Sequence, residues 1–475
     1  MDARVVEELR AVLGPVGVLA DRARCTTYES DGLALARQVP ELVILPKDTR
    51  ETAAAMRILH AHGIAIVPRG AGTGLSGGAT PVAGGVVIGT ARMREILELD
   101  VVNRCARVQA GVVNVDLGHA AARHGLFYAP DPSSQKACTI GGNVGENSGG
   151  PHCFRHGSTT RHVLGLVIVM ADGLVLDLSQ PELDPRGYDL VGLFVGSEGL
   201  LGIATEITVA LQPIPPTTET ILALFRDLDS ACDAVSDLIA ARLEPSAIEI
   251  LDRLTIEAVE ASVLAAGYPT DAEAVLLLET EGSEAEVAAL GSRIEPVLRA
   301  RGAFDLRRAR DDVERARLWA GRKGAYGAMG RIAPDLYVCD AVVPRTQLAR
   351  IVREIIVICR ARGLRIANVF HAGDGNLHPN IPYDRRDADE LARVLDAGDA
   401  ILRACLAVGG SLTGEHGVGL EKIGAMELAF GPDDLAAQCR VREAWDPDRR
   451  MNPGKLLPVH ACRETRTRDP RAAPR

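Results

Sequence analysis

The spacing of hydrophobic positions changes about halfway along this 475-residue chain. Between residues 41 and 211, short apolar runs alternate with clusters of glycine, a pattern that predicts strands separated by turns. The expected strands are Leu42–Leu45, Ile64–Val67, Val86–Ile88, Arg107–Val108, Val163–Met170, Leu174–Leu178 and Ile203–Leu211. Helices are expected among them at Arg50–His62 and Val115–His124. Together these elements indicate an α+β or α/β domain.

From about residue 219 to residue 450, the apolar positions instead recur with the period of an amphipathic helix. The expected helices are Ser230–Arg242, Glu284–Arg301, Arg345–Arg362, Asp387–Val408 and Asp433–Ala444. Strands are expected between them at Thr220–Phe225, Ala274–Glu279, Leu336–Val343 and Ile366–Phe370. This pattern predicts a second α+β domain, in which helices pack on an antiparallel sheet.

A proline-rich segment separates the two patterns. Three of the four residues from 213 to 216 are proline, which cannot continue a central strand or a helix. We therefore expect one domain over residues 1–215 and another over residues 216–449. The basic run from 463 to 475 contains two prolines, and we expect it to be a disordered tail.

Charge and composition exclude several classes of protein. The net charge of −10, with no basic cluster, argues against nucleic acid as a partner. None of the ten cysteines forms a C-x-x-C pair, so the chain has no iron–sulfur or zinc–thiolate spacing of its own. The longest strongly apolar run, residues 163–171, is too short for a transmembrane segment, and acidic residues near the N-terminus do not suit a signal peptide. We expect a cytoplasmic protein.

A glycine-rich loop follows the expected strand Ile64–Val67. Glycines let the backbone approach a ligand closely and point successive N–H groups at one phosphate or pyrophosphate. Gly72, Gly74 and Gly77 also satisfy the dinucleotide fingerprint G-x-G-x-x-G. That fingerprint requires a following helix, and residues 78–85 are a poor helix, so a nicotinamide site is disfavoured. A plain surface loop is the alternative.

Two further glycine-rich stretches lie beside expected strands, at residues 130–150 and 196–203. Their glycines are mixed with Asn, Ser and Thr, which offer uncharged hydrogen bonds suited to a polar ring system or a ribityl chain. One such loop is a weak signal. Three in one domain indicate a single large cofactor lined by several loops.

The second domain carries two motifs rich in histidine. His371 and His378 frame a glycine-rich turn, and Glu415 and His416 lie in another about forty residues later. Two histidines and one carboxylate form a common ligand set for a divalent metal. The spacing alone does not require a metal, because histidines in loops also bond simply to the backbone.

In their order along the chain, these motifs resemble the FAD-linked 2-hydroxy-acid dehydrogenases, which are flavoproteins of the vanillyl-alcohol oxidase type. The resemblance rests on the three glycine loops, Leu318–Lys323, His371–His378, Gly414–Gly417 and Asn452–Lys455, and it extends over roughly residues 20 to 460. It implies a two-domain FAD-binding fold of α+β class, with a helix-on-sheet substrate or cap domain. It also implies that residues 450–462 return to the FAD-binding domain.

The resemblance implies a set of residues for each part of the site. Those expected at the FAD are Pro68, Arg69, Gly70, Ala71, Gly72, Thr73, Gly74, Leu75, Ser76, Gly77, Pro130, Asp131, Ser134, Thr139, Gly141, Gly142, Asn143, Asn147, Ser148, Gly149, Glu198, Gly202, Ile203 and Asn452. Relatives with covalent flavin carry a histidine near the first loop. Residues 69–78 contain none, so we expect noncovalent FAD.

The same resemblance assigns the chemistry. Relatives place a divalent metal (Zn, Mn or Fe) at the positions of His371, His378 and Glu415. His416 is then the expected base for the substrate hydroxyl, and Arg322 the expected clamp for its carboxylate. Tyr326 is counted with the catalytic residues. Without the resemblance, Arg322 would be predicted to be a surface residue of a helix.

The expected reaction is oxidation of a small D-2-hydroxy acid, glycolate or D-lactate, to the 2-oxo acid. Relatives that take D-2-hydroxyglutarate carry a lysine where this chain has Val338 and a small hydroxyl residue where it has Tyr326. Two alternatives remain: a D-2-hydroxyglutarate dehydrogenase, and a non-catalytic subunit that holds FAD in a larger complex. Electrons are expected to leave through partner FAD-binding and iron–sulfur subunits or a quinone pool, with peripheral attachment to the inner membrane through such partners.

Overall fold

The computed structural model describes residues 1–179 and 187–462, so the expected tail at 463–475 lies outside the described residues. The chain divides into two compact units. The first contains residues 1–149, 158–214 and the chain from Glu415 onward, and the second contains residues 150–157 and 215–414. The proline-rich segment lies at the division after Ile214. The chain rejoins the first unit at Glu415, earlier than residue 450.

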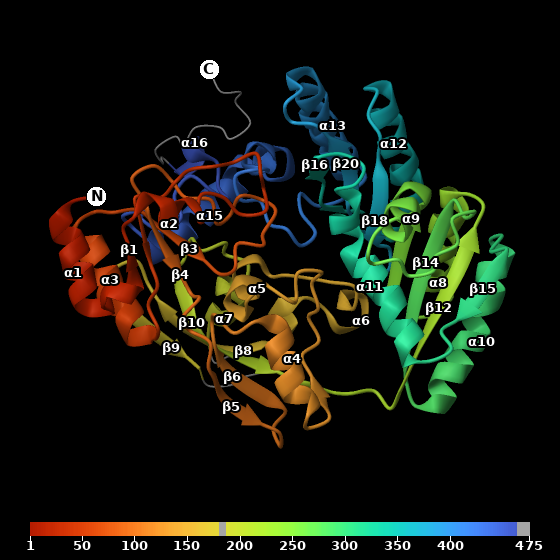
Figure 1. The fold of residues 1–475 in the computed structure, drawn as a ribbon, viewed down its shortest axis with the longest axis horizontal. Helices are drawn as coiled ribbons and strands as arrows, with labels where there is room; N and C mark the ends of the chain where they lie inside the picture. The colour runs from red at the N-terminus through yellow and green to blue at the C-terminus, as the bar shows by residue number, and fades with distance from the viewer. Residues whose placement is uncertain (180–186, 463–475) are drawn as a thin grey trace. The chain divides into compact units, whose positions relative to one another are not determined.

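A four-stranded sheet forms one part of the first unit (Figure 1). Its strands, in the order β1-β2-β4-β3, are β1 (Val18–Leu19), β2 (Leu42–Ile44), β4 (Val86–Gly89) and β3 (Ile66–Arg69). Strands β2 and β3 run parallel to β4, and the helices α1 (Ala3–Leu13) and α3 (Thr49–Ala61) pack beside them. Helix α3 begins at Thr49 because the Asp48 side chain accepts the N–H of Glu51.

An antiparallel sheet of five strands forms the other part of this unit. Its order is β5 (Ile96–Asp100), β6 (Cys105–Gln109), β10 (Ile203–Ala210), β8 (Val163–Val169) and β9 (Val175–Leu178). A smaller pair joins β7 (Leu126–Phe127) to β11 (Gln212–Pro213). The remaining helices of the unit are α2 (Arg22–Thr26), α4 (Asn114–Ala122), α5 (Ile140–Glu146), α7 (Leu190–Phe194), α14 (Met426–Ala429), α15 (Pro432–Trp445) and α16 (Val459–Cys462).

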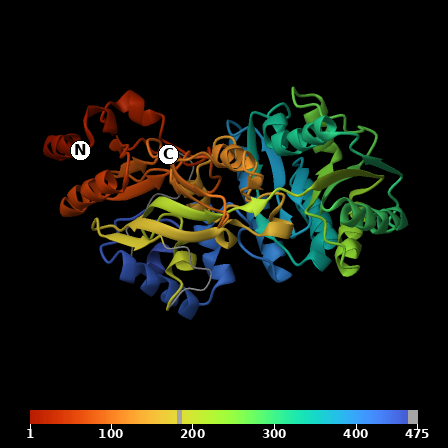
Figure 2. The same ribbon diagram turned by 90° about the horizontal axis from the view of Figure 1, so that it is seen from below.

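The second unit is built on a larger antiparallel sheet, whose order is β15-β12-β14-β13-β18-β19-β17, with β20 joining β18 to β16. Its strands are β12 (Thr217–Phe225), β13 (Ala247–Asp252), β14 (Ala274–Gly282), β15 (Asp305–Arg308), β16 (Asp335–Val338), β17 (Ala341–Val342), β18 (Ala367–His371), β19 (Asn376–Leu377) and β20 (Pro379–Tyr383). Its helices are α6 (Cys153–His156), α8 (Leu228–Ala240), α9 (Arg253–Glu260), α10 (Glu284–Ala300), α11 (Asp312–Met329), α12 (Leu348–Ala361) and α13 (Ala388–Ala407). Helices α9 and α11 cover one face of the sheet, and α8 and α10 cover the other (Figure 2).

The predicted α+β class and the sheet covered by helices are confirmed. Three local predictions differ from the structure. Leu336–Val343 is not one strand, because β16 pairs with β20 whereas β17 pairs with β19. The loop predicted at 130–150 contains helix α5, which Thr139 caps and whose Ile140 and Val144 are buried in the core. Helix α15 belongs to the first unit, where Trp445 packs near Phe194.

Candidate active site

The first glycine loop, residues 70–78, connects β3 toward its parallel neighbour β4 without an intervening helix. Within the described part of the chain, none of its nine backbone N–H groups donates a hydrogen bond. Ser76, Gly77 and Gly78 are nevertheless buried, and the Ser76 hydroxyl also has no partner among the described residues. Buried N–H groups in native proteins are almost always paired, so the loop suits a ligand with several acceptor oxygens, such as a pyrophosphate.

The first loop contacts the start of helix α5 through bare backbone. A Cβ at Gly70 would lie 2.6 Å from Thr139 Oγ1, so only glycine fits there. A Cβ at Gly145 would meet no atom within 4 Å, and one at Gly74 none closer than 3.9 Å. A Cβ at Gly78 would lie 2.8 Å from Glu146 Oε1, so the two segments are close at Gly70 and Gly78 and leave open space at other positions. This is the kind of cradle that a large flat cofactor needs.

Polar side chains of the second loop bond mainly to the protein itself. The Thr139 hydroxyl accepts the N–H of Gly142, and Asn143 Oδ1 accepts from Asn114 Nδ2 at 3.0 Å. Asn147 Oδ1 accepts from the N–H of Thr160, and the Ser148 hydroxyl accepts from Asn143 Nδ2. These side chains hold the loop in shape. Their contribution to a cofactor would therefore come chiefly through backbone groups.

The other residues predicted in this stretch lie in the turn before α5 and at its first turn. The carbonyl of Pro130 accepts a hydrogen bond from Asn114, and that of Ser134 accepts from the N–H of Cys138. Gly141 donates its N–H to Ala110, and a Cβ at Gly141 would lie 2.7 Å from the Ala110 Cβ. Asp131 follows Pro130 and is half-buried.

The third loop is joined to the C-terminal return of the chain. Glu198, at φ 49°, accepts the N–H groups of Val418 and Gly419 with its two carboxylate oxygens, each at 2.7 Å. Asn452 Nδ2 donates both to the carbonyl of Glu198 at 2.7 Å and to that of Gly78 at 2.9 Å. Asn452 therefore connects the first and third loops. Gly202 and Ile203, also predicted here, lead into β10.

A buried lysine also bonds to the first loop and to Asn452. Lys455 Nζ donates to the carbonyls of Gly78 and Thr80 and to Asn452 Oδ1, at 2.5 to 2.7 Å. Burial lowers the pKa of Lys455 to about 7. Burial also raises the pKa of Glu146 well above its ordinary value, and the nearby carboxylates of Glu198 and Asp31 raise it further.

In the second unit, the predicted residues His371 and Arg322 meet at a buried carboxylate. Glu249 Oε1 lies 2.7 Å from His371 Nδ1, and Glu249 Oε2 accepts from Arg322 Nε at 2.6 Å and from Nη2 at 2.5 Å. All three side chains are at most 5 % exposed. Arg322 is therefore a buried residue of α11 and not the surface residue that its helix alone suggests. One edge of its guanidinium is already occupied by Glu249.

His378 has a carboxylate of its own. Its Nδ1 lies 3.7 Å from Asp340 Oδ1, and Asp340 Oδ2 accepts from the Thr413 hydroxyl and from the N–H of Gly414. The rings of His371 and His378 are 5.2 Å apart and nearly perpendicular. In protein metal sites, a carboxylate that bonds one imidazole nitrogen orients the other nitrogen toward the ion, and Glu249 makes such a bond to His371. The residues of this unit thus suit a divalent metal.

The other predicted residues lie nearby in the chain. Glu415 and His416 directly follow Gly414, and both are half-buried. Tyr326 lies one turn after Arg322 on α11, is 46 % exposed, and has a pKa raised by burial of part of its ring.

Neither Glu249 nor Asp340 was predicted as a site residue from the sequence. Glu249 lies between apolar residues of strand β13, which ends at a second acid, Asp252, and the Glu249 side chain is fully buried. An acidic residue within an apolar run could have indicated a buried polar contact from the sequence, because a carboxylate is seldom buried without a partner. Asp340 lies at the break between β16 and β17, which the sequence did not indicate.

Comparison with known proteins places these features in a family. Residues 40–179 match the FAD binding domain family, and residues 214–456 match the C-terminal domain of FAD linked oxidases. The chain belongs to the FAD-linked oxidases. The two matches include residues of both units. The predicted assignment to this family and the use of FAD are confirmed, and this FAD-linked oxidase is an oxidoreductase.

Curated relatives align with the FAD-linked oxidase over almost its full length. Glycolate oxidase subunit GlcD of Escherichia coli strain K12 is 46 % identical over 461 residues, which cover 97 % of this chain and 92 % of that protein. Glycolate oxidase subunit GlcD of Bacillus subtilis is 40 % identical, covering 95 % and 96 %. D-lactate dehydrogenase of Anaerostipes hadrus is 31 % identical, covering 95 % and 97 %.

Solved structures share the fold at low sequence identity. p-Cresol methylhydroxylase with substrate bound superposes with a TM-score of 0.82 at 16 % identity, over 96 % of this chain and 97 % of that chain. 4-Ethylphenol oxidase from Gulosibacter chungangensis gives 0.80 at 20 % identity, over 96 % and 98 %. The predicted fold of the vanillyl-alcohol oxidase type is confirmed. Among the described residues, no helix is both long and apolar enough to cross a membrane.

Proposed function

We propose that this FAD-linked oxidase converts a small 2-hydroxy acid, glycolate or D-lactate, into the corresponding 2-oxo acid. The reaction removes a proton from the hydroxyl and a hydride from the α-carbon, leaving a carbonyl. The observation that carries the proposal is the 46 % identity to a glycolate oxidase subunit over 97 % of the chain. The relatives whose names state a D-lactate dehydrogenase activity support the same substrate class.

FAD, when bound, supplies the acceptor for the hydride. We propose that the loops 70–78, 139–149 and 196–203 hold it noncovalently. The N–H groups of the first loop, which have no acceptor among the described residues, would bind the pyrophosphate. The proposed role of Asn452 is to keep the first and third loops together, because its amide bonds a carbonyl of each. Denatured protein that retains its flavin would contradict noncovalent binding.

A divalent metal, when bound, supplies a Lewis acid that lowers the pKa of the substrate hydroxyl. His371, His378 and Glu415 are the proposed ligands. Glu249 would orient the His371 imidazole through its hydrogen bond to Nδ1. Asp340 Oδ1, 3.7 Å from His378 Nδ1, is too distant for a hydrogen bond and would supply negative charge beside that ring. His416, the residue after Glu415, is the proposed base that receives the hydroxyl proton.

Arg322 is the proposed partner of the substrate carboxylate. Because Glu249 occupies the edge formed by Nε and Nη2, a substrate would meet the end of the guanidinium that carries Nη1. A guanidinium has five donors and can serve two carboxylates at once. The half-exposed Tyr326, one turn along the same helix, is proposed to border the substrate.

The experiment that tests the function follows the flavin absorption during anaerobic addition of glycolate, D-lactate, L-lactate or D-2-hydroxyglutarate. Bleaching by glycolate or D-lactate is the expected result. A strong preference for D-2-hydroxyglutarate would contradict the substrate proposal. A flavin that no 2-hydroxy acid reduces would favour a non-catalytic FAD subunit.

The proposal includes a partner for the electrons. The chain has no C-x-x-C pair to hold a cluster, and the glycolate oxidase relatives are named as subunits. We therefore propose that reduced flavin passes its electrons to an iron–sulfur partner subunit or to a quinone. Rapid reoxidation by dissolved oxygen alone, at the full turnover rate, would make such a partner unnecessary.

A further inference from the structure

A short segment of the chain leaves the first unit directly after the second glycine loop. Residues 150–157, here called the strap, group with the second unit, although residues 149 and 158 belong to the first. Outside the strap, Thr159 bonds back to Ser148: its N–H and its hydroxyl both donate to the Ser148 carbonyl, at 3.1 and 2.8 Å. The residues that flank the strap are therefore held together by these hydrogen bonds, next to the second glycine loop in the sequence.

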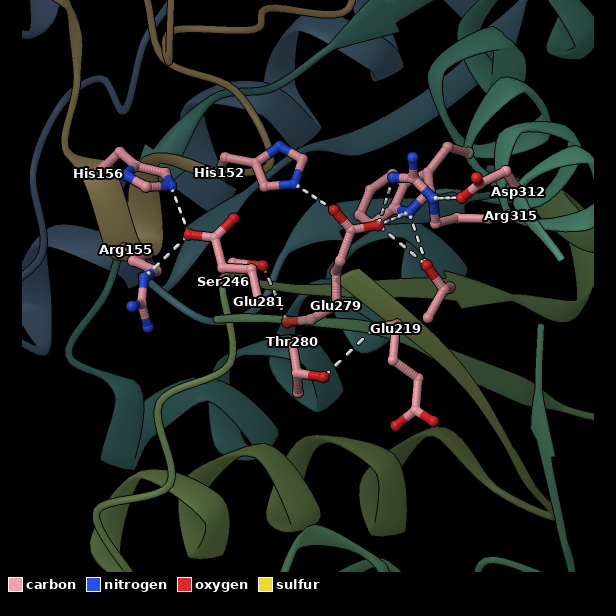
Figure 3. A network of polar contacts seen from close by, with 12 residues as sticks. His152, Arg155, His156, Glu219, Ser246, Glu279, Thr280, Glu281, Asp312 and Arg315 are labelled. Carbon is pink, nitrogen blue, oxygen red and sulfur yellow. Dashed lines mark hydrogen bonds and ion pairs between the residues drawn. The ribbon is translucent and has the colours of Figure 1, made fainter. Parts of the chain in front are cut away.

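Two buried carboxylates of β14 hold the strap (Figure 3). His152 Nε2 lies 3.0 Å from Glu279 Oε1, while Arg155 Nε and His156 Nε2 lie 2.9 and 2.8 Å from Glu281 Oε1. Glu279 and Glu281 are two residues apart on one strand, so they point to the same face of the sheet. Their side chains are only 5 % and 8 % exposed, so these contacts are better shielded from water than a surface ion pair.

The first of these carboxylates also touches the helix that carries Arg322. Glu279 Oε2 accepts from Trp319 Nε1 at 2.5 Å and from the Thr220 hydroxyl at 2.9 Å, and the His152 ring lies 5.4 Å from the Trp319 ring. Trp319 lies one turn before Arg322 on α11. The strap is thus anchored on the same helix as the proposed carboxylate partner.

Between these anchors, Phe154 lies against the turn that joins His371 to His378. A Cβ placed on Gly373 would be 2.8 Å from Phe154 Cγ, so the ring packs directly on the backbone of the turn. The N–H of Gly373 donates to the carbonyl of Ile248, the residue before Glu249. Backbone bonding to β13 and contact with Phe154 therefore both restrain this turn.

We propose that Phe154 is a positioning residue, which keeps the His371–His378 turn in place for oxidation of the substrate. The ion pairs of the strap hold Phe154 in this position. This inference rests on the proposed function, because it gives the turn a part in the reaction. Physically, a glycine-rich turn has little side-chain packing of its own, so an aromatic ring from elsewhere supplies it.

A double-mutant cycle on the FAD-loaded protein tests the contact. Phe154→Ala is expected to accelerate hydrogen exchange in the peptide that spans residues 371–378 and to slow flavin reduction by glycolate, on the order of tenfold to a hundredfold. Gly373→Ala alone is expected to slow reduction as well, because its methyl group collides with the ring. In the Phe154→Ala background, Gly373→Ala should slow flavin reduction no further, because the methyl group occupies the space that the ring has left.

Two variants act as controls. The Phe154 ring lies 5.6 Å from the guanidinium carbon of Arg345, and the Phe304 ring lies 3.9 Å from that of Arg226. Phe304→Ala therefore removes a comparable ring, beside the edge strand β15 and away from the turn. It should leave exchange at 371–378 and flavin reduction unchanged. Phe154→Tyr keeps the ring and should behave as the parent protein. If Phe154→Ala fails to fold, Gly373→Ala and Phe154→Tyr still test the contact.

The outcomes separate this inference from the proposed function. Additive effects in the cycle, or normal exchange in folded Phe154→Ala, would overturn the contact. Faster hydrogen exchange at residues 371–378 in Phe154→Ala, with an unchanged rate of flavin reduction, would overturn the role of Phe154 in positioning. If the parent protein is reduced by neither glycolate nor D-lactate, the proposed function fails, and the exchange data alone then decide whether Phe154 holds the turn.

Discussion

Glu249 and His371 form a 2.7 Å hydrogen bond between two side chains that are almost completely buried. Because Glu249 also pairs with Arg322, one carboxylate from β13 fixes a proposed metal ligand and a proposed substrate contact together. Within the second unit, the side-chain positions of His371 and Arg322 therefore depend on Glu249. Its replacement should reveal whether these residues act in the reaction.

Glu249→Gln should slow flavin reduction by glycolate about tenfold to a hundredfold while FAD remains bound, because the residues proposed to hold FAD lie on other elements. It should also lower the free energy of unfolding, by about 3–5 kcal/mol, since it leaves a buried guanidinium without its counter-charge. Rapid mixing and thermal melts measure the two effects. Glu273→Gln is the control, because the Glu273 and Arg253 side chains are about half exposed. Equal rates of flavin reduction in Glu249→Gln and Glu273→Gln would contradict the prediction.

His416→Ala should lose flavin reduction by about a hundredfold or more and keep its bound FAD. The reason is that a proposed base acts only on the substrate hydroxyl and has no part in holding the cofactor. The absorption spectrum reports the bound FAD, and anaerobic rapid mixing reports its reduction. His124→Ala, at an exposed position after α4, is the matched control. Retained turnover in His416→Ala would remove this residue from the mechanism.

Lys455→Met should weaken FAD binding about tenfold to a hundredfold, which corresponds to ~1.4–3 kcal/mol. Methionine has a similar length but cannot donate, so the carbonyls of Gly78 and Thr80 lose their shared partner next to the first loop. Titration of the apoprotein with FAD measures the affinity. Lys47→Met, whose side chain is half exposed, should bind FAD normally. An unchanged affinity in Lys455→Met would show that the loop holds its shape without the lysine.

Asn452→Gly should raise the dissociation constant of FAD about tenfold, because it removes both hydrogen bonds that connect the first and third loops. Glycine adopts the backbone φ of 42° at this position without strain, so the variant isolates the side-chain amide. Asn452→Ala should bind FAD more weakly still, because alanine disfavours that conformation. Equal affinities for Asn452→Gly and the parent protein would argue against the connecting role.

Glu146→Gln should change the dependence of stability on pH. The pKa of Glu146 is raised in the folded protein, chiefly by burial, so the folded state holds a proton that the unfolded state releases above about pH 4.5. Stability from this group is therefore greatest below pH 4.5 and declines as the pH rises toward the raised pKa. Glutamine cannot ionise, so thermal melts of the variant should lack this decline. Parallel melting curves for variant and parent would contradict the prediction.

The fold was predictable as far as it follows local periodicity. Apolar runs such as Val163–Val169 and helices such as α8 and α10 were expected within a few residues of their observed bounds. Two central elements, β13 and α11, were not expected. The first is interrupted by Glu249, and the second carries three glycines and many charged residues, so neither shows a clean period.

The candidate site was predictable in its residue types but not in its contacts. Glycine clusters indicate ligand loops because few other residues allow the backbone such close approach. Which polar side chains bond to the protein instead depends on neighbours far along the chain. Asn143 bonds to Asn114, and Glu198 bonds to the backbone after Gly417, 220 residues later in sequence. No local pattern contains that information.

The sequence by itself determined the two-domain organisation in outline, the loops suited to FAD, and the histidines that suggest a metal. These follow from residue type and spacing, which act over a few residues. The tertiary structure decided that Arg322 is buried on Glu249, that Asn452 and Lys455 hold the first loop, and that Phe154 packs on Gly373. Each of these joins segments distant in sequence, and such pairs meet only when sheets and helices pack into a common core.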